Sequence, residues 1–446
     1  MASTNLNRTP SSASNRRTWT WSAWVKRSNI STGNQVLFQG MTGGFPEKIQ
    51  FTSSDRIEYD HDIAGTDYTI YSSAQFRDTN GWYHIVVAKD TTQATETNRI
   101  KVYVNGEQLA MTEESLGYPG QNYEGQINNN VEHCIGSNTN NGEFFSGLMS
   151  HVHFCDGSQL APTVFGSTDS VTGEWKINTS PSFTPGTNGF TILKDGNTIT
   201  DQSANSNNFA LEAGTLTKTE DNPSNLFATL NPLFTSSNTI NFTNGNTRAT
   251  GVDYQNQRTG GTLASSSGKF YFESKVTGNA GFGGSIIGIA DYDNANIVNS
   301  NTWFGSESNF VGFYGASNIT VGGGGNTNAY GSISVGDIIG FAFDIDNGFA
   351  YVSINGTWQN SGVPTSGSTG TGNVNRTGNL NYNFSGKLMG IAGGFQVTDS
   401  WQSNFGNGYF GTTAVSSAGT NASGNGIFEY DLPTGYTALS TKGLNL

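Results

Sequence analysis

The chain has 446 residues, and its 34 acidic and 21 basic residues give a formal net charge of −13. An aromatic content of 12% argues against a disordered chain, because disordered segments contain few aromatic residues. No basic run is longer than Arg16-Arg17, which argues against nucleic-acid binding. The sequence has no run of 18 apolar residues, so no membrane-spanning segment is predicted. With 59 glycines and only 12% charged residues, the composition favours an all-β protein.

The first 16 residues contain no apolar stretch, so we expect no signal peptide. The next segment, RTWTWSAWVKR, is predicted to be a strand. Period-two alternation places Trp19 and Trp21 on an apolar face that belongs to the interior of a sandwich. Trp24 lies on the opposite face among hydroxyl side chains, and we predict that it covers an inter-domain or inter-subunit contact.

Short β-rich runs alternate with turn residues through the first domain, residues 1–166. The clearest pair is residues 83–88 and 100–104, and the second of these runs ends in Asn105-Gly106, which suits a type I′ turn. Cys134 and Cys155 are too few for a disulfide framework, and buried free thiols are favoured over a bridge.

Residues 167–237 are rich in Pro, Gly, Asn and Asp and are predicted to be a connector with short strands. The second β-rich domain, residues 238–446, contains KFYFESKVTG, GSIIGIADYDN and GDIIGFAFDIDNGFAYVSINGTW, followed by a C-terminal tail. No helix of convincing length is expected. The predicted fold is therefore all-β, with two antiparallel β-sandwich (jelly-roll) domains joined by an ordered connector.

Two resemblances rest on these runs. TWTWSAWVKR, GWYHIVVAKD, IKVYVNGEQL, HCIGSN and FFSGLMSHVHFCDGSQL resemble the concanavalin A-like, laminin-G-like family. KFYFESKVTG, IIGIADYDN, NFVGFYGASN and GDIIGFAFDIDNGFAYVSINGTW resemble SPRY domains, which are also two-sheet sandwiches.

Both units together, with the connector motifs TNGF and DQSANSNNF and the ending LPTGYTALSTKGLNL, resemble virion proteins of tailed bacteriophages. That resemblance implies a non-enzymatic tail fibre, appendage or receptor-binding protein that recognises a host-surface glycan or protein. A capsid decoration protein is the alternative, and a lectin or glucanase is more remote. It also implies synthesis in the bacterial host cytoplasm, a place in the virion with other virion proteins as partners, and a homo-oligomer, with a trimer expected.

Candidate sites are few. Glucanases with a concanavalin-like sandwich need acids on one strand face, and only EYD at 429–431 and DID at 344–346 come near, so no catalytic residue is assigned. Asp60, Asp62 and Asp67 are predicted to lie in an acidic loop with too few oxygens for calcium, which stays the one cofactor left open.

His151 and His153 lack partners for zinc and are expected at the surface, so no metal site is predicted. The candidate ligand-binding residues are aromatic side chains in or beside loops of the second domain, where rings could stack on sugars. They are Trp303, Phe304, Tyr314 and Trp401.

Overall fold

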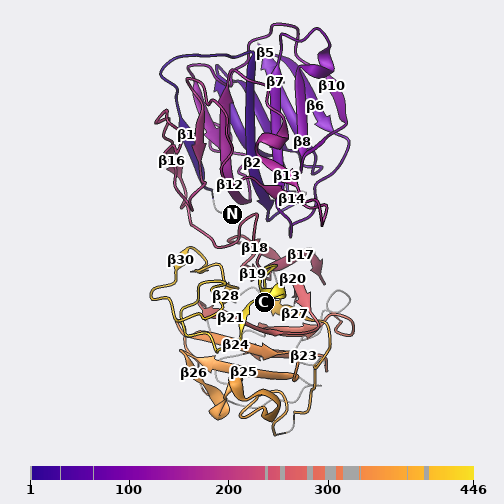
Figure 1. The fold of residues 1–446 in the computed structure, drawn as a ribbon, viewed down its shortest axis with the longest axis vertical. Helices are drawn as coiled ribbons and strands as arrows, with labels where there is room; N and C mark the ends of the chain where they lie inside the picture. Colours follow the sequence, from indigo (N-terminus) through magenta and orange to yellow (C-terminus); the bar gives the residue numbers. More distant parts are fainter. Residues whose placement is uncertain are drawn as a thin grey trace. The chain divides into compact units, whose positions relative to one another are not determined.

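The computed structural model describes residues 3–30, 32–63, 65–236, 240–251, 257–278, 285–296, 308–314, 331, 333–378, 380–395 and 401–446. The chain divides into two compact units (Figure 1). Unit 1 comprises residues 1–218 and 222–224, and unit 2 comprises residues 219–221 and 225–446. Within the described ranges, no helix is long and apolar enough to cross a membrane.

Unit 1 is a β-sandwich, and its described residues form two large antiparallel sheets. The larger sheet has the strand order β10 (Met111–Ser115), β6 (Thr66–Ser72), β5 (Ile57–Ile63), β4 (Phe45–Phe51), β3 (Gln35–Thr42), β11 (Glu132–Ile135), β1 (Asn5–Arg8) and β16 (Ala210–Ala213). The smaller sheet has the order β15 (Phe190–Ile192), β12 (Gly147–Asp156), β2 (Thr18–Arg27), β7 (Tyr83–Asp90), β8 (Ile100–Val104) and β9 (Glu107–Gln108). A separate hairpin joins β13 (Gly166–Thr168) to β14 (Trp175–Ile177), and two short 3-10 helices lie at η1 (Glu96–Asn98) and η2 (Pro162–Val164).

The strand β2 confirms the predicted alternation. Trp19 and Trp21 are fully buried in the core between the two sheets, where the Trp21 ring stacks on Phe38 with ring centroids 6.2 Å apart. The predicted Asn-Gly turn also forms, because Asn105 and Gly106 connect β8 to β9 with φ values of 49° and 86°, which a type I′ turn requires.

The predicted connector differs from the structure. β15 pairs with β12 and β16 pairs with β1, so residues beyond 166 complete both sheets of unit 1. The motifs TNGF (187–190) and DQSANSNNF (201–209) hold this segment in place, since Asp201 accepts hydrogen bonds from the backbone N–H groups of Thr191 and Asn207. Short polar motifs of this kind look like loops in a sequence, because their side chains bond to nearby backbone groups and show no strand-like alternation.

A fragment ending at residue 165 is expected to be unstable. It lacks Phe190, Ile192 and Phe209, which are 2%, 0% and 5% exposed in the core, and burying such side chains contributes about 1.5–3 kcal/mol each. Residues 1–165 should therefore bind a hydrophobic dye and lose cooperative thermal unfolding, whereas residues 1–218 should unfold in one transition. Equal melting temperatures for the two fragments would contradict this assignment.

Unit 2 is a second sandwich built on two sheets of its described residues. One has the order β17 (Leu230–Thr235), β20 (Gln257–Ser265), β27 (Met389–Phe395), β22 (Ile286–Asp291) and β23 (Phe310–Tyr314). The other has the order β26 (Thr357–Trp358), β25 (Phe349–Ile354), β24 (Ile338–Asp344), β21 (Lys269–Val276) and β28 (Trp401–Asn404), and β31 (Thr437–Ala438) pairs with β21. The small pairs are β18 (Asn241–Thr243) with β19 (Arg248–Thr250) and β29 (Tyr409–Phe410) with β30 (Thr413–Ala414), and the 3-10 helices are η4 (Gln359–Ser361), η5 (Pro364–Thr369) and η6 (Gly443–Asn445).

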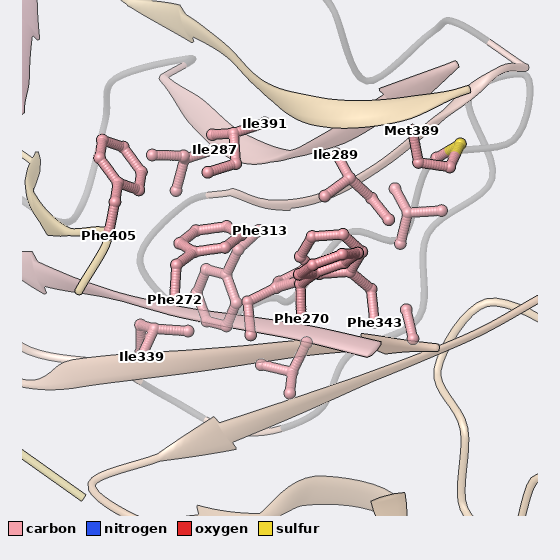
Figure 2. Close-up of a cluster of buried hydrophobic side chains, with 14 of the residues drawn as sticks. Phe270, Phe272, Ile287, Ile289, Phe313, Ile339, Phe343, Met389, Ile391 and Phe405 are labelled. Atoms are coloured by element: carbon pink, nitrogen blue, oxygen red, sulfur yellow. The ribbon is translucent and has the colours of Figure 1, made fainter. Parts of the chain in front are cut away.

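The core of unit 2 lies between its two sheets. Figure 2 shows Phe270 and Phe272 of β21 pointing toward Ile287 and Ile289 of β22. The opposite face of β21 is buried as well, because the C-terminal residues pack on it: Tyr271 lies 5.0 Å from Phe428, ring centroid to ring centroid. The C-terminal segment is therefore part of the sandwich rather than a free tail.

Beneath the C-terminal segment, the carboxyl group of Glu273 is fully buried. It accepts hydrogen bonds from the backbone N–H groups of Glu429 (2.8 Å) and Tyr430 (2.9 Å) and from the Tyr271 hydroxyl (3.0 Å). Burial nevertheless raises the pKa of Glu273 to about 7.

Candidate functional site

The aromatic candidates of the second domain do not form a described site. Trp303 and Phe304 lie outside the described residues, and Tyr314 ends β23 with only its backbone described. The prediction that Trp401 lies in or beside a binding loop is corrected by the structure. Trp401 is 4% exposed and its ring packs in the core, with its centroid 5.9 Å from that of Phe313. Its place at the start of β28 turns the ring inward, so it offers no stacking surface for a ligand.

Trp24 is 4% exposed, and the contact it makes is within unit 1. Its ring stacks on the His84 imidazole, with ring centroids 4.9 Å apart. Trp175 of the β13–β14 hairpin stacks on the same imidazole, with ring centroids 5.9 Å apart. The Trp175 indole can only donate, so it donates to Nδ1 of His84 (3.0 Å), while Nε2–H of His84 donates to the Ser22 hydroxyl (2.9 Å). The hairpin thus covers the face of β2 that was predicted to cover another domain or subunit.

The two histidines that were expected at the surface are not both there. His153 is 3% exposed and stacks on Phe165 at 5.5 Å, whereas His151 is half-buried with a φ of 50°. A β-bulge between Ser150 and His153 separates them, which breaks the simple alternation used in the prediction. Their ring centroids are 6.3 Å apart.

A polar surface covers the outer face of the larger sheet of unit 1, on the side away from core residues such as Ile49 and Tyr59. We call it the polar face. Because side chains alternate along each strand, the pairing register places its members in rows across the sheet. The first row is Asn7, Cys134, Gln39, Lys48, Asp60, Thr69 and Glu114, each directly opposite the next. The second row is Gln50, Glu58, Tyr71 and Thr112.

Three acids of β5, Glu58, Asp60 and Asp62, share this face. The Lys48 ammonium lies 3.3 Å from Asp60, and the Gln50 amide donates to Glu58. Burial raises the pKa of both Glu58 and Asp60, although Lys48 and Gln50 partly oppose the shift. The face is therefore rich in carboxyl and amide oxygens that can accept hydrogen bonds and are only partly hydrated.

The predicted acidic loop is a β-hairpin. Asp62 and Asp67 lie opposite each other on β5 and β6, and Asp62 accepts a hydrogen bond from the backbone N–H of Gly65 (2.7 Å). Sequence reasoning missed the Glu-x-Asp-x-Asp run of residues 58–62 because Asp and Glu are poor strand formers. The alternation with Ile57, Tyr59 and His61 was the signal that could have found it.

Three amide oxygens of the polar face are buried without a hydrogen-bond partner among the described residues. They belong to Asn5, Gln39 and Gln50, whose side chains are only 1–2% exposed. The loop that follows β11 contacts this face, because Asn141 accepts a hydrogen bond from the Asn5 amide (2.8 Å) and Glu143 lies 3.8 Å from Lys48. A buried acceptor without a donor costs about 1–3 kcal/mol, so these atoms mark places where a further donor or cation would be stabilised.

A different polar cluster is sealed inside the sandwich. Oε1 of Glu47 accepts hydrogen bonds from Lys89 Nζ (2.6 Å) and the Tyr59 hydroxyl (2.6 Å), and Oε2 accepts from the backbone N–H of Ile127 (2.7 Å). Glu47 and Lys89 are both fully buried. Burial alone would raise the pKa of Glu47, but Lys89 and these donors lower it, so the pair stays charged.

Compared with known protein families, residues 2–165 match the family model described as the concanavalin A-like lectin/glucanases superfamily. Unit 1 therefore carries a concanavalin A-like, laminin-G-like sandwich. No curated protein matches the sequence.

Three solved structures are similar in fold. A heptameric SAP-like pentraxin from Limulus polyphemus has 18% identity and a TM-score of 0.26, covering 35% of this chain and 71% of the pentraxin. The SPRY domain of human HERC1 has 13% identity and a TM-score of 0.26, and the match covers 39% of this chain and 92% of the SPRY domain chain. Domain 4 of the arabinanase AbnA from Geobacillus stearothermophilus, solved with arabinotriose, has 19% identity and a TM-score of 0.27. This match covers 34% of this chain and 65% of the arabinanase chain.

Proposed function

We propose that the chain is a non-enzymatic recognition protein of a tailed-bacteriophage particle, a tail fibre, appendage or receptor-binding protein, and that the polar face of unit 1 binds a host-surface glycan. The observation that carries the proposal is the two rows of polar side chains across the outer face of the larger sheet. The phage assignment rests on the sequence resemblance of the two units and the motifs between and after them.

The chemistry of the face suits a polyhydroxylated ligand. Glu58 and Asp60 offer carboxylate oxygens that accept hydrogen bonds from hydroxyl groups, and hydrogen bonds to charged groups contribute about 1.5–3 kcal/mol each. Tyr71 lies between Glu58 and Thr112 in the second row, and its half-buried ring presents an aromatic surface beside the acids. Arg56 lies over the same ring, 4.9 Å from its centroid, and fixes its orientation.

Binding rather than cleavage is proposed because the acids of β5 are already engaged, Asp60 with Lys48 and Glu58 with Gln50. A retaining glycosidase needs two carboxyl groups about 5–5.5 Å apart, of which one is free to attack the sugar. Reducing sugar released by the full chain from purified host glycan would contradict the non-enzymatic assignment.

The test is glycan binding by the full chain and by matched tyrosine variants. Tyr71→Ala should weaken the binding of purified host-surface glycan about five- to ten-fold, because it removes one aromatic contact from the face. Tyr103→Ala, on β8 of the other sheet, should leave the affinity unchanged. Equal affinities for both variants would place the binding site elsewhere.

The place of the chain on the particle separates the two structural roles. A recognition protein should be seen on the tail, and its deletion should abolish adsorption to the host. Stoichiometric binding to empty capsids with unchanged adsorption would instead identify a capsid decoration protein. Symmetry would multiply weak contacts into avidity, so we expect a homotrimer, which light scattering would test.

A further inference from the structure

One end of the polar face brings a thiol and two carboxyl groups together from separate strands. Glu132 and Cys134 lie on β11 and Glu212 lies on β16, and β1 lies between these two strands and pairs with both. One ligand atom from each residue lies within 4.8 Å of the others, and Cys134 Sγ is 4.0 Å from Glu212 Oε2.

Neither carboxyl group of this cluster is neutralised by a basic side chain in the described part of the chain. Glu132 accepts a hydrogen bond from the amide of Asn7 (3.0 Å), and Glu212 accepts from the amides of Asn5 (2.9 Å) and Asn141 (3.3 Å). Amides orient the two carboxylates but leave their charges uncompensated. Burial and the two glutamates raise the pKa of the Cys134 thiol to about 12.

An independent observation concerns two buried acceptor oxygens on the strands that flank β11. Oδ1 of Asn5 is buried and unpartnered among the described residues, and it belongs to the same amide that bonds Glu212. Oε1 of Gln39 is likewise unpartnered, and Gln39 lies directly across the ladder from Cys134. Asn5 is 1% exposed and Gln39 is 2% exposed, so two buried acceptor oxygens lie on the same sheet face as the cluster, on strands next to β11.

We propose that Glu132, Cys134 and Glu212 bind a zinc ion, with a water molecule as the fourth ligand. Zinc accepts sulfur and oxygen ligands in a tetrahedron, whereas calcium and magnesium take oxygen ligands only and calcium needs six to eight. Binding forms one Zn–S and two Zn–O bonds, and the thiol proton leaves to solvent. Cys134 belongs to the first row of the polar face, but zinc binding at this end of the face does not depend on the proposed glycan binding.

Zinc binding requires only a small movement of Glu212 toward Cys134. Zn–S and Zn–O bonds of about 2.3 and 2.1 Å at a tetrahedral angle place sulfur and oxygen about 3.6 Å apart. The observed separation of Cys134 and Glu212 is 4.0 Å. Glu212 is exposed on the edge strand β16, so its side chain can close this gap without moving the sheet and gives the ion a route from solvent.

The experiment uses the full chain, freed of metal by chelation, titrated with zinc chloride alone. We expect one zinc ion per chain, a higher melting temperature for unit 1 and, with cobalt in place of zinc, a thiolate-to-metal charge-transfer band. Cys134→Ser should abolish that band, and both Cys134→Ser and Glu212→Gln should weaken zinc binding about 10- to 100-fold. Because Glu212 is exposed, Glu212→Gln tests the site even where Cys134→Ser disturbs folding.

The matched control is Cys155→Ser, which removes the other buried free thiol of unit 1 and should leave zinc affinity unchanged. Failure of the full chain to bind zinc, or equal affinity in Cys134→Ser and the parent chain, would overturn the proposal. Displacement of zinc by an equal concentration of calcium would also overturn it, because a site with a thiolate ligand disfavours calcium.

Discussion

Acidification from pH 7 to about pH 4.5 is expected to unfold unit 1 before unit 2. All five histidines of the chain lie in unit 1. Burial lowers the pKa of three of them, His61, His84 and His153, to about 3. It lowers the pKa of the other two, His133 and His151, to about 4. Below about pH 6.5 the unfolded chain takes up protons that the folded unit refuses, so the free energy of unfolding falls as the pH drops towards 4.

The size of this effect follows from the number of buried imidazoles. Each contributes about 1.4 kcal/mol per pH unit inside the window, and the four buried ones together about 5 kcal/mol per pH unit. The two pH units from about 6.5 to about 4.5 therefore remove about 10 kcal/mol, which is comparable to the total stability of a domain, about 5–15 kcal/mol.

Unit 2 contains no histidine and provides the internal control. The raised pKa of Glu273 acts in the opposite direction, because the unfolded chain loses this proton above about pH 4.5 and the folded unit keeps it up to about pH 7. Unit 2 should therefore gain stability as the pH falls from 7 to 5. Hydrogen exchange of β7 and β24 peptides between pH 7 and pH 4.5, corrected for intrinsic rates, would show β7 exposed first. Simultaneous exposure of both peptides would refute the expectation.

Loss of the internal ion pair is expected to be the most damaging single substitution in unit 1. Lys89→Met leaves the Glu47 carboxylate fully buried, and among the described residues the Tyr59 hydroxyl and one backbone N–H remain as its hydrogen-bond donors. Removing one partner of a buried pair costs about 3–5 kcal/mol, which corresponds to a fall in melting temperature of roughly 10 °C. The double variant Glu47→Leu/Lys89→Met should recover much of that loss, because no buried charge then remains.

A steric test of the same cluster uses two glycines of one loop. A Cβ atom at Gly125 would lie 1.9 Å from Glu47 Oε2 and 2.6 Å from Lys89 Nζ, whereas a Cβ at Gly120 would meet nothing within 4 Å. Gly125→Ala should therefore lower the melting temperature of unit 1 strongly, and Gly120→Ala should leave it nearly unchanged. Equal effects would mean that the loop does not close over the ion pair.

Strands with a clear apolar alternation were predictable from the sequence, and strands with acidic alternation were not. Trp19 and Trp21 fall every second residue in a run of good strand formers, so β2 and its core face followed directly. In β5 the period is the same, but Glu58, Asp60 and Asp62 occupy its outer positions. The polar face was missed because single-sequence reasoning treats an acidic run as a solvated loop.

The burial of the outer face of β2, on which Trp24 lies, could not be predicted from the sequence either. Hydroxyl side chains beside Trp24 suggested an exposed surface, yet the β13–β14 hairpin covers it by placing Trp175 on His84. That packing needs glycine at two distant positions, since a Cβ at Gly106 or Gly166 would lie 2.5 or 2.7 Å from the Trp175 ring. Such pairings depend on tertiary contacts that no local pattern encodes.

The pairing of β1 with β16 determines how unit 1 would respond to a pulling force. Asn5 and Ala213 are direct partners at one end of this ladder, and Thr4 and Thr215 bond to each other just beyond it. Tension applied to the chain before residue 4 and after residue 215 would therefore pull both strands from the same end and break their hydrogen bonds one after another. Until the edge strand β16 separates from β1, little load would reach the other strands, so a stretched chain would extend at this junction while the rest of the sandwich keeps its shape.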